Sequence, residues 1–452
     1  MARNNGDNRT AIDRRGSIAP TGRQASGEDT TSDAARSPAA KPRRSKSRLL
    51  LTLGAMGPGI VAAMAGNDAG GISTYSTAGA EFGYATLWMI PIMTVLLCIV
   101  QETCARMGAV TGKGLSSLIR ENFGIRLAAI AMLALLVANT STTLSEFAGV
   151  AAGMELFGVS KYVSVPVAAL AVWLLVMRGS YQGVQKVFLA ISLVFVTYVV
   201  AAFITHPDWA AVLHSTFVPQ FNSNVSFVSL IIATIGTTIA PWMLFFTQNN
   251  VVEKGVTYDE MYLQRVDIVT GAVVACLVAW FIIITTGTVL FPAGITISSA
   301  ADAANALAPI AGEYAQVLFA AGLVAASLLA ACVLPLTTSY AICEAFGWER
   351  GLNYSWKDAP VFKTMFTVII ALSVIIVLLP SANLMRIMLV AQVVSGALLP
   401  VLLIFMVKIV NDPHVMGTHA NGKVYNLITW VSVVLVIALT VMLFVLQLLG
   451  FG

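Results

Sequence analysis

The chain has 452 residues, of which 58% are hydrophobic and only 11% are charged, with a formal net charge of +4. Soluble domains carry about 25% charged residues, so this sequence holds too few polar side chains to cover a soluble core. The composition excludes an ordinary soluble domain and predicts an all-α membrane protein.

Residues 1–48 differ from the rest of the chain. They are rich in Arg, Ser, Ala, Gly and Asp and contain almost no large apolar side chain. Such a segment buries too little surface to fold, and it lacks the apolar region of a cleavable signal peptide. We expect a disordered, basic cytoplasmic tail; contact of this tail with anionic lipid remains an alternative.

Eleven stretches are free of Asp, Glu, Lys and Arg, and each can hold one membrane-spanning helix of about 20 residues. In the sixth, Asn and Ser residues predict a loop before a span that begins near residue 226. The stretches are 49–67, 82–101, 127–145, 162–177, 187–205, 209–252, 268–301, 314–343, 364–385, 387–407 and 424–452.

The basic residues predict the orientation of these spans. If the N-terminus lies in the cytoplasm, 24 Lys and Arg residues fall on the inner side and 2, Lys161 and Arg386, on the outer side. Basic residues accumulate in cytoplasmic loops, so this distribution places the N-terminus inside and the C-terminus outside.

Two predicted spans are interrupted at corresponding places. The first contains Gly57-Pro58-Gly59 and the run from Gly66 to Gly71; the sixth contains Gly236 and Pro241. Clustered Gly and Pro weaken a helix, and unwound backbone at membrane depth must line a cavity or be buried in protein. A matched pair of breaks is typical of transporters built from inverted repeats, with the binding site between the breaks.

This symmetry predicts four parts of the chain. They are a tail (1–48), a first five-helix repeat (49–204), a second five-helix repeat (205–408), and an inner loop with an eleventh helix (409–452).

The first break contains Asp68, and a carboxylate inside a membrane span is expensive and usually functional. Together with freed backbone carbonyls, it predicts an oxygen site for a hard cation such as Mg²⁺, Mn²⁺ or Ca²⁺. Gln101 and Gln392 add neutral oxygens. Glu146, in the third span, is either a site residue or an acid reaching the outer surface, and the role of Glu102 stays open.

The five cysteines have no metal-site spacing and are interpreted as small packing residues. We find no nucleophile–base or metal-hydrolase motif, so an enzyme is not expected.

Three segments resemble the Nramp divalent-metal transporters. The run Ala105–Leu115 is similar to the end of that family's second span, Met56–Gly59 to the entry of its first span, and Leu389–Val394 to its tenth span. The resemblance covers roughly residues 50–450. It implies a LeuT-like fold of two inverted five-helix repeats plus an eleventh helix.

The departures from that family all fall in the expected site. Its Asp-Pro-Gly-Asn becomes Asp68-Ala69-Gly70-Gly71, its Met-Pro-His becomes Ala240-Pro241-Trp242, and its span-3 Asp and Glu fall at Thr143 and Glu146. This combination resembles the bacterial Nramp-related magnesium transporters. By that resemblance, Ala65 and Thr237 offer backbone carbonyls to the metal, and Gln392 lines the site.

The resemblance and the ligand chemistry together predict uptake of hydrated Mg²⁺, and also Mn²⁺, without proton coupling. A thioether is a soft ligand of little use to Mg²⁺, and a site without Asn and Met side chains leaves room for water on the ion. The alternatives are a proton-coupled Mn²⁺/Fe²⁺ transporter and, in another class, a LeuT-like organic-solute carrier or a receptor. We expect a monomer in a bacterial cytoplasmic membrane, with the metal as substrate, no cofactor and no nucleic-acid partner.

Overall fold

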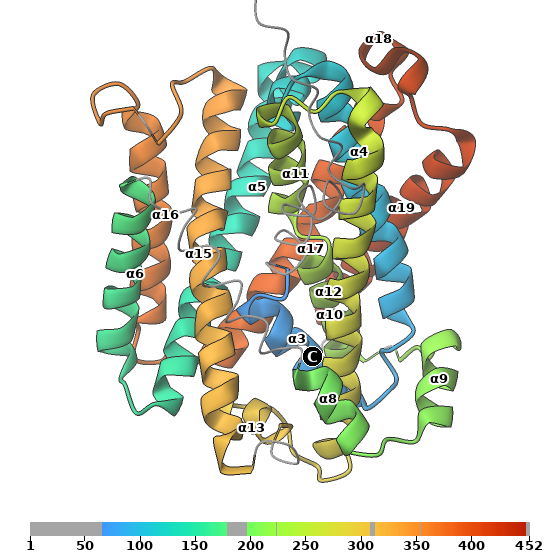
Figure 1. Ribbon diagram of the computed structural model, residues 1–452, viewed down its shortest axis with the longest axis vertical. Helices are drawn as coiled ribbons and strands as arrows, with labels where there is room; N and C mark the ends of the chain where they lie inside the picture. Colours follow the sequence, from blue (N-terminus) through green and yellow to red (C-terminus); the bar gives the residue numbers. More distant parts are fainter. Residues whose placement is uncertain (1–65, 179–196, 223, 308–311, 353, 449–452) are drawn as a thin grey trace, which may run out of the picture. The chain divides into compact units, whose positions relative to one another are not determined.

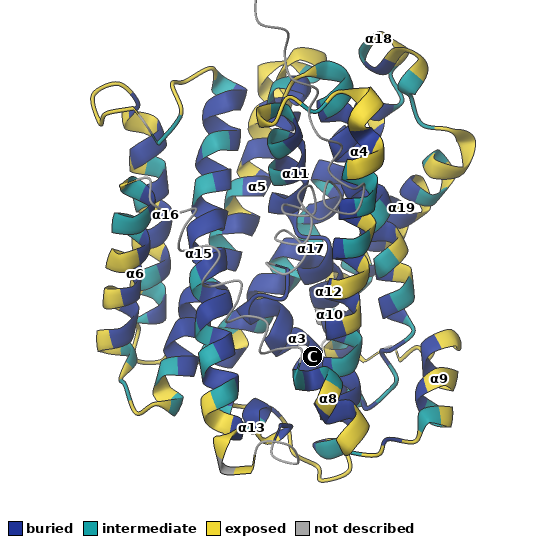
Figure 2. Ribbon diagram, viewed as in Figure 1, coloured by how far each residue is buried: buried dark blue, intermediate teal, exposed yellow. Residues whose placement is uncertain are grey.

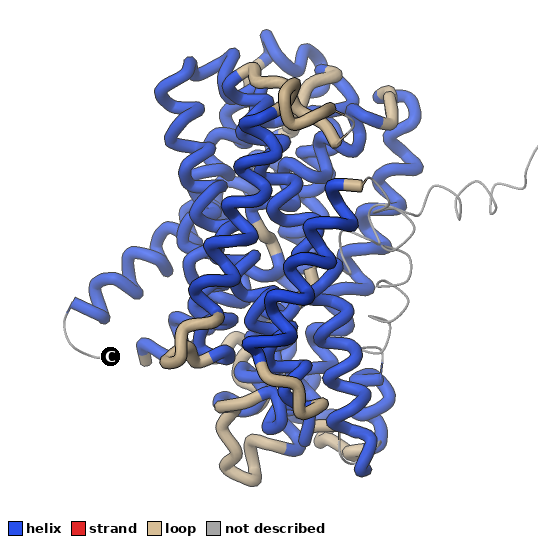
Figure 3. Tube along the Cα trace, turned by 90° about the vertical axis from the view of Figure 1, so that its left-hand side faces the viewer, coloured by secondary structure: helices blue, strands red, loops and turns tan. Residues whose placement is uncertain are grey.

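A computed structural model describes residues 66–178, 197–222, 224–307, 312–352 and 354–448. The chain divides into two units, Met1–Lys46 and Ser47–Gly452, and all of the described residues belong to the second. The predicted tail and the proposed ligand Ala65 lie outside the described residues. Every regular element within them is a helix, as predicted for an all-α protein (Figure 3).

Within the described residues, eight segments are long and apolar enough to cross a membrane. They are formed by α4 (Met89–Thr111), α5 (Leu115–Leu156), α10 with α11 (Val225–Thr238 and Pro241–Glu253), α12 (Met261–Val289), α15 (Ala315–Phe346), α16 (Pro360–Val377), α17 (Leu384–Val410) and α19 (Lys423–Leu448).

Two more helices lie in the remaining predicted spans. The apolar α6 (Lys161–Met177) fills the fourth, and α8 (Thr197–Ile204) lies in the fifth, whose residues before 197 are not described. Of the first predicted stretch, 49–67, only residues 66 and 67 are described, and the helix α3 (Ala69–Phe82) begins after it. Short connecting helices are α9 (Trp209–Phe217), α13 (Ala300–Asn305) and α18 (Pro413–Met416), with 3₁₀ turns η2 (Tyr258–Glu260), η3 (Gly312–Tyr314) and η4 (Gly417–His419).

Several predicted boundaries were wrong, because the charge-free stretches do not mark helix ends. The helix α4 starts at Met89 and continues to Thr111, past the predicted end at 101. It ends at Gly112, which has a φ of 64°. Residues with a side chain adopt this left-handed conformation less readily than glycine does. The helix α5 begins at Leu115 and changes direction at Gly124, where φ is 78°. The predicted loop before residue 226 contains the helix α9.

The helix α3 lies inside the bundle and contacts α5, α10, α12 and α17 (Figure 1). Its residues from Ala69 to Ala80 are all buried, including the polar residues between them (Figure 2). The outward faces of other helices are apolar instead: Val167 on α6 and Ile375 on α16 are 63% and 62% exposed. An apolar outside around a polar central helix is the arrangement expected of a membrane transporter.

Two glycines bring the backbones of α10 and α17 together. A Cβ atom on Gly236 would lie 2.2 Å from the carbonyl oxygen of Gln392, and one on Gly396 would lie 2.3 Å from that of Ile232. Small residues at such crossings allow close helix packing in membranes. This contact holds the first half of the broken sixth span against the helix that carries Gln392.

Candidate metal site

The first break ends at Asp68, which caps the N-terminus of α3. Residues 66–68 are not helical, and the Asp68 carboxylate accepts a hydrogen bond of 2.8 Å from the Gly71 N–H. Its side chain is only 3% exposed. Short polar residues favour this capping position because they satisfy N–H groups that a helix start leaves free. A carboxylate is therefore fixed in the interior at the start of a buried helix.

The second break separates α10 from α11 at Ile239 and Ala240. Ile239 has φ −117° and ψ 66°, Ala240 has φ −70° and ψ 140°, and α11 begins at Pro241. Proline suits the first position of a helix because the N–H it lacks would have no partner there. The sequence therefore restarts the helix immediately after the break, as the Gly/Pro pattern predicts.

A hydrogen bond joins the helices on either side of these breaks. The Thr238 hydroxyl donates to the Thr234 carbonyl at 2.6 Å, and it lies 2.9 Å from the Tyr75 hydroxyl. Because Thr238 has already used its proton, Tyr75 is the donor in the second bond. The contact ties α3 to the last residue of α10.

Three oxygens surround the space that a side chain at Gly71 would occupy. The Cβ position of residue 71 lies 2.8 Å from the Gly66 carbonyl oxygen, 2.9 Å from the Thr237 hydroxyl and 3.4 Å from the Asp68 carboxylate. The Thr237 hydroxyl has no hydrogen-bond partner. Carboxylate, carbonyl and hydroxyl oxygens are the ligands that hard cations prefer. The Thr237 side chain and the Gly66 carbonyl thus extend the expected oxygen set.

Glu146 of α5 reaches the same helix start. It is fully buried, and its carboxylate accepts a hydrogen bond of 3.2 Å from the Ala69 N–H, while its other oxygen has no partner. The Asp68 and Glu146 carboxyl groups also interact electrostatically with each other. The alternative of an acid reaching the outer surface does not fit a side chain placed here.

The approach of α3 to α5 depends on Gly149. A Cβ atom there would lie 2.3 Å from the Ala69 Cβ and 2.5 Å from the Ser327 hydroxyl of α15. Gly149 lies three residues after Glu146, so both residues face the start of α3. The absence of a side chain at this position lets the Ala69 N–H reach the Glu146 carboxylate.

Gln392 of α17 covers the other side of the α3 start. A Cβ atom on Gly70 would lie 1.8 Å from the Gln392 amide nitrogen, and neither polar atom of this buried amide has a hydrogen-bond partner among the described residues. An unsatisfied buried polar group costs about 1–3 kcal/mol. A hydrated ion beside Asp68 would supply the missing partners.

The remaining residues expected at the site, Trp242, Thr143 and Gln101, make their contacts with other residues and not with Asp68 within the described part of the chain. Trp242 is buried in the first turn of α11 with its ring 5.6 Å from that of Phe246, and its indole N–H has no partner. The Thr143 hydroxyl donates to the Asn139 carbonyl of its own helix at 2.7 Å. The Gln101 amide faces the Met243 sulfur at 3.9 Å.

The sequence analysis did not identify Tyr75 or Ser327 as neighbours of the site, and it included Gly66 and Asn67 only as parts of the first break. A signal for α3 existed, because its polar side chains on every face are unusual in an apolar span. Tyr75 belongs to that helix, whereas the backbone oxygen of Gly66 and the single hydroxyl of Ser327 leave no pattern in the sequence.

A separate polar network joins α4, α12 and the segment before α19. The Glu102 carboxylate contacts Arg106 at 3.2 Å and Arg265 at 2.9 Å. Arg106 also donates to the His419 carbonyl and to the Asn421 side chain. Both oxygens of Glu102 are used in these contacts, so this acid belongs to a structural network distinct from the Asp68 site.

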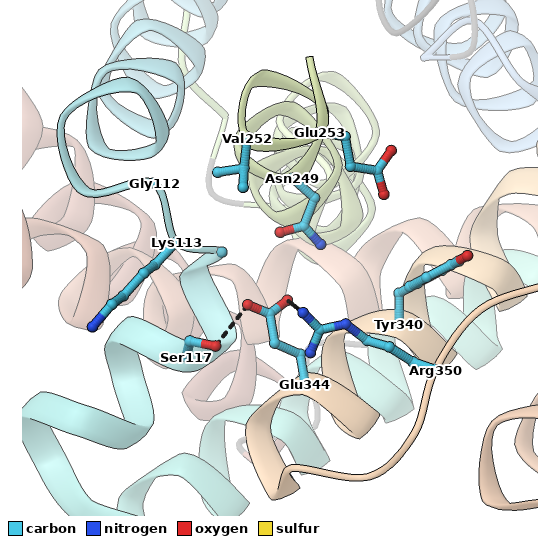
Figure 4. Close-up of a pocket in the computed structure, with 10 residues that line it drawn as sticks. Gly112, Lys113, Ser117, Asn249, Val252, Glu253, Tyr340, Glu344 and Arg350 are labelled. Atoms are coloured by element: carbon cyan, nitrogen blue, oxygen red, sulfur yellow. Dashed lines mark hydrogen bonds and ion pairs between the residues drawn. The ribbon is translucent and has the colours of Figure 1, made fainter. Parts of the chain in front are cut away.

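A polar pocket lies between the ends of α11 and α15 and the α4–α5 connection (Figure 4). In it, the buried Glu344 carboxylate accepts a 2.7 Å hydrogen bond from Ser117 and lies 3.9 Å from Arg350. The Lys113 ammonium points out of the pocket and pairs with Glu121 at 2.7 Å. The Glu344 charge is therefore already neutralised by protein groups.

A buried carboxylate at the start of α3 and a break between α10 and α11, inside an all-α bundle, are typical of a secondary transporter with a LeuT-like fold. The sequence profile of Nramp, described as natural resistance-associated macrophage protein-like, matches residues 59–446. The chain belongs to the Nramp family. This confirms the resemblance stated from the sequence motifs, and with it the expectation that the chain is not an enzyme.

Sequence relatives agree with this membership, and solved structures share the fold. The divalent metal cation transporter MntH of Bacillus subtilis is 25% identical over 400 residues, covering 86% of this chain and 91% of the relative. MntH of Deinococcus radiodurans is 26% identical over 400 residues, which cover 85% of this chain and 88% of the relative. The Eremococcus coleocola manganese transporter, bound to an aromatic bis-isothiourea compound, has a TM-score of 0.70 at 21% identity, covering 89% and 88%. MhsT in complex with L-phenylalanine has a TM-score of 0.57 at 14% identity, covering 86% and 97%.

Proposed function

We propose that this chain takes up divalent metal ions across a bacterial cytoplasmic membrane, preferring Mg²⁺ and also carrying Mn²⁺, without coupled proton movement. Divalent metal transport is supported by the MntH relatives, which are named for it. The preference for Mg²⁺ is supported by one observation above all: the oxygens around Gly71 have no side chain between them and no thioether at Ala240 beside them.

The ligand chemistry favours a hard, hydrated ion. Asp68, the Gly66 carbonyl and the Thr237 hydroxyl are oxygen donors, which suit Mg²⁺ better than soft ions. Mg²⁺ dehydrates reluctantly and keeps several waters, so its site needs space as well as ligands. A glycine at residue 71 lets the Gly66 carbonyl and the Thr237 hydroxyl approach the Asp68 carboxylate, and the Gln392 amide, which has no hydrogen-bond partner among the described residues, can bind a water on the ion.

The start of α3 can accept a cation although the N-terminal end of a helix dipole is positive. The exposed N–H groups of a helix start repel cations. Here the Ala69 N–H is bonded to Glu146 and the Gly71 N–H to Asp68. The two carboxylates thus cover the N–H groups and present negative charge to the site.

The orientation we propose has the basic loops in the cytoplasm. The polar ends that contain Glu102 and Glu344 then lie inside, and the C-terminus lies outside. With a negative interior, a divalent ion gains about 4.6 kcal/mol at 100 mV, from about 2.3 kcal/mol per charge. That energy is sufficient to accumulate Mg²⁺ without a proton gradient.

The test is uptake into proteoliposomes under a negative internal potential, with Mg²⁺, Mn²⁺, Ca²⁺ and Cd²⁺ added in turn. We expect Mg²⁺ and Mn²⁺ to enter, Asp68→Ala to abolish both fluxes, and Asp358→Ala, a change at an exposed acid, to leave them unchanged. Near-normal uptake by a folded Asp68→Ala variant would sink the site assignment. Faster entry of Cd²⁺ than of Mg²⁺ would contradict the preference.

One contact favours the alternative of a proton-coupled Mn²⁺/Fe²⁺ transporter. The Asp68 and Glu146 carboxyl groups interact inside the protein, and two neighbouring carboxyl groups favour a state in which one of them holds a proton, which an arriving metal would displace. We place the alternative second because Thr143 and Trp242 provide no titratable group from which that proton could be passed on. An organic-solute carrier is less well supported, since no basic side chain contacts Asp68 or Gln392 among the described residues.

A further inference from the structure

A small cavity lies beside the first break and is lined by both halves of the transporter. It is bounded by Gly66, Asn67 and Tyr75 of the first span, Thr238 and Met243 around the second break, and Cys276 of α12. Its free space suffices for about one water molecule. An ion of similar size bound there would touch the backbone that leads directly to Asp68.

The donors of this cavity differ in kind from those around Gly71. Cys276 and Met243 are 3% and 2% exposed, and both are sulfur donors that line the same space. The Gln101 amide lies 3.9 Å from the Met243 sulfur, which fixes the thioether in place. The Asn67 amide nitrogen donates to the Ala275 carbonyl at 3.4 Å, so its oxygen is the atom left for a ligand. Thiolate and thioether sulfur select soft metal ions.

We propose that Cys276 and Met243 form a binding site for a soft cation of the Cd²⁺ or Hg²⁺ class, which adjoins the Asp68 site at Gly66 but has different ligands. On binding, the Cys276 S–H bond breaks, a sulfur–metal bond forms, and the proton is released to water. Met243 contributes a neutral second sulfur. The bound ion joins α11 to α12 and therefore blocks transport.

The block follows from the position of the two sulfurs. Met243 belongs to α11, the second half of the broken sixth span, and Cys276 belongs to the next helix along the chain. Alternating access requires broken-helix elements to move against their neighbours. A metal that holds the two helices together prevents this movement without occupying the Mg²⁺ site. Only this blocking step depends on the proposed transport function.

Binding is tested on the purified full-length protein titrated with Cd²⁺, followed by the ultraviolet charge-transfer absorption of a cadmium–thiolate bond. We expect the band in the unchanged protein and in Cys332→Ser, a variant at a buried thiol of α15 outside the cavity. Cys276→Ser should abolish the band, and Met243→Leu should weaken Cd²⁺ binding about tenfold or more. A band that persists in folded Cys276→Ser overturns the proposal.

Transport gives an independent readout. Cd²⁺ should inhibit Mg²⁺ uptake by the unchanged protein and by Cys332→Ser, whereas Cys276→Ser and Met243→Leu should resist inhibition about tenfold. Equal inhibition of all four proteins would place the inhibitory Cd²⁺ elsewhere and overturn the proposal. If no protein carries Mg²⁺ but the cadmium–thiolate band still depends on Cys276, the proposed function fails while the soft-cation site stands.

Discussion

The Glu146 carboxylate of α5 accepts a hydrogen bond of 3.2 Å from the backbone N–H of Ala69, the first residue of α3. One helix therefore caps another at the point where the first span is broken. Asp68 caps the same helix start from within its own segment through the Gly71 N–H. The carboxylate proposed to bind metal is held in position from both sides.

We predict different effects of two changes at Glu146. Glu146→Gln keeps a side-chain oxygen that can accept from the Ala69 N–H, whereas Glu146→Ala leaves that buried donor unpaired at about 1–3 kcal/mol. The Ala variant should melt at a lower temperature than the Gln variant in detergent, and it should carry less Mn²⁺. Equal melting temperatures would show that the cap does not stabilise the helix start.

The second prediction concerns the absence of a soft ligand at Ala240. Ala240→Met should raise uptake of Cd²⁺ and Mn²⁺ relative to Mg²⁺ in proteoliposomes, because the thioether binds soft ions. Ala240→Leu is the matched control, since it adds similar bulk without sulfur. Ala240 is only 2% exposed, so folding of both variants must be checked. If both shift the ion preference equally, volume and not sulfur is responsible.

Combining Ala240→Met with Gly71→Asn should shift the preference further if Asn fits. The Cβ at residue 71 would approach the Gly66 carbonyl oxygen to 2.8 Å, so this backbone must move. An unchanged Mg²⁺/Mn²⁺ ratio in a folded double variant would mean that these side chains do not set selectivity.

The third prediction concerns the driving force. Metal binding can release the proton between Asp68 and Glu146, but movement of that proton across the membrane needs further titratable groups. Proteoliposomes with a pH-sensitive dye inside should show Mg²⁺ or Mn²⁺ uptake at negative internal potential without acidification. Acidification that depends on both the metal and the protein would establish the proton-coupled alternative.

The fourth prediction compares two arginines on one carboxylate. Arg106 and Arg265 both contact Glu102, with side chains 8% and 43% exposed. Breaking a buried ion pair costs about 3–5 kcal/mol, whereas an exposed pair contributes up to about 1 kcal/mol. Arg106→Gln should therefore lower the melting temperature much more than Arg265→Gln. The reverse order would mean that Arg265 of α12 stabilises the network more than Arg106 does.

The sequence was sufficient for the parts of this fold that depend on composition. Charge-free stretches predicted the spans, and paired Gly and Pro located the breaks at Asp68 and Ala240. Helix ends could not be read in the same way, because α4 buries Glu102 and Arg106 as an ion pair and continues past them. The charges that seemed to end the span are neutralised within the helix.

The site could be predicted only where it depends on an unusual residue. An acid in an apolar span predicted Asp68 as a ligand, and the family resemblance added Gln392 and the backbone carbonyl of Thr237, whereas the structure brings the Thr237 hydroxyl near Asp68. The placement of Glu146 on Ala69 depends on Gly149 and on the approach of α5 to α3, a contact between residues 77 positions apart. A single sequence does not indicate that two residues so far apart in the chain are in contact.

The glycine contact between α10 and α17 determines which parts of the protein can move together. With Gly236 against the Gln392 carbonyl and Gly396 against that of Ile232, no side chains separate the two backbones at these contacts, and we expect α10 and α17 to move together. The two helices are then expected to move as one rigid unit. If α10 tilts during transport, it carries the Gln392 amide toward or away from the start of α3, so opening the path and releasing a water from the ion become a single event.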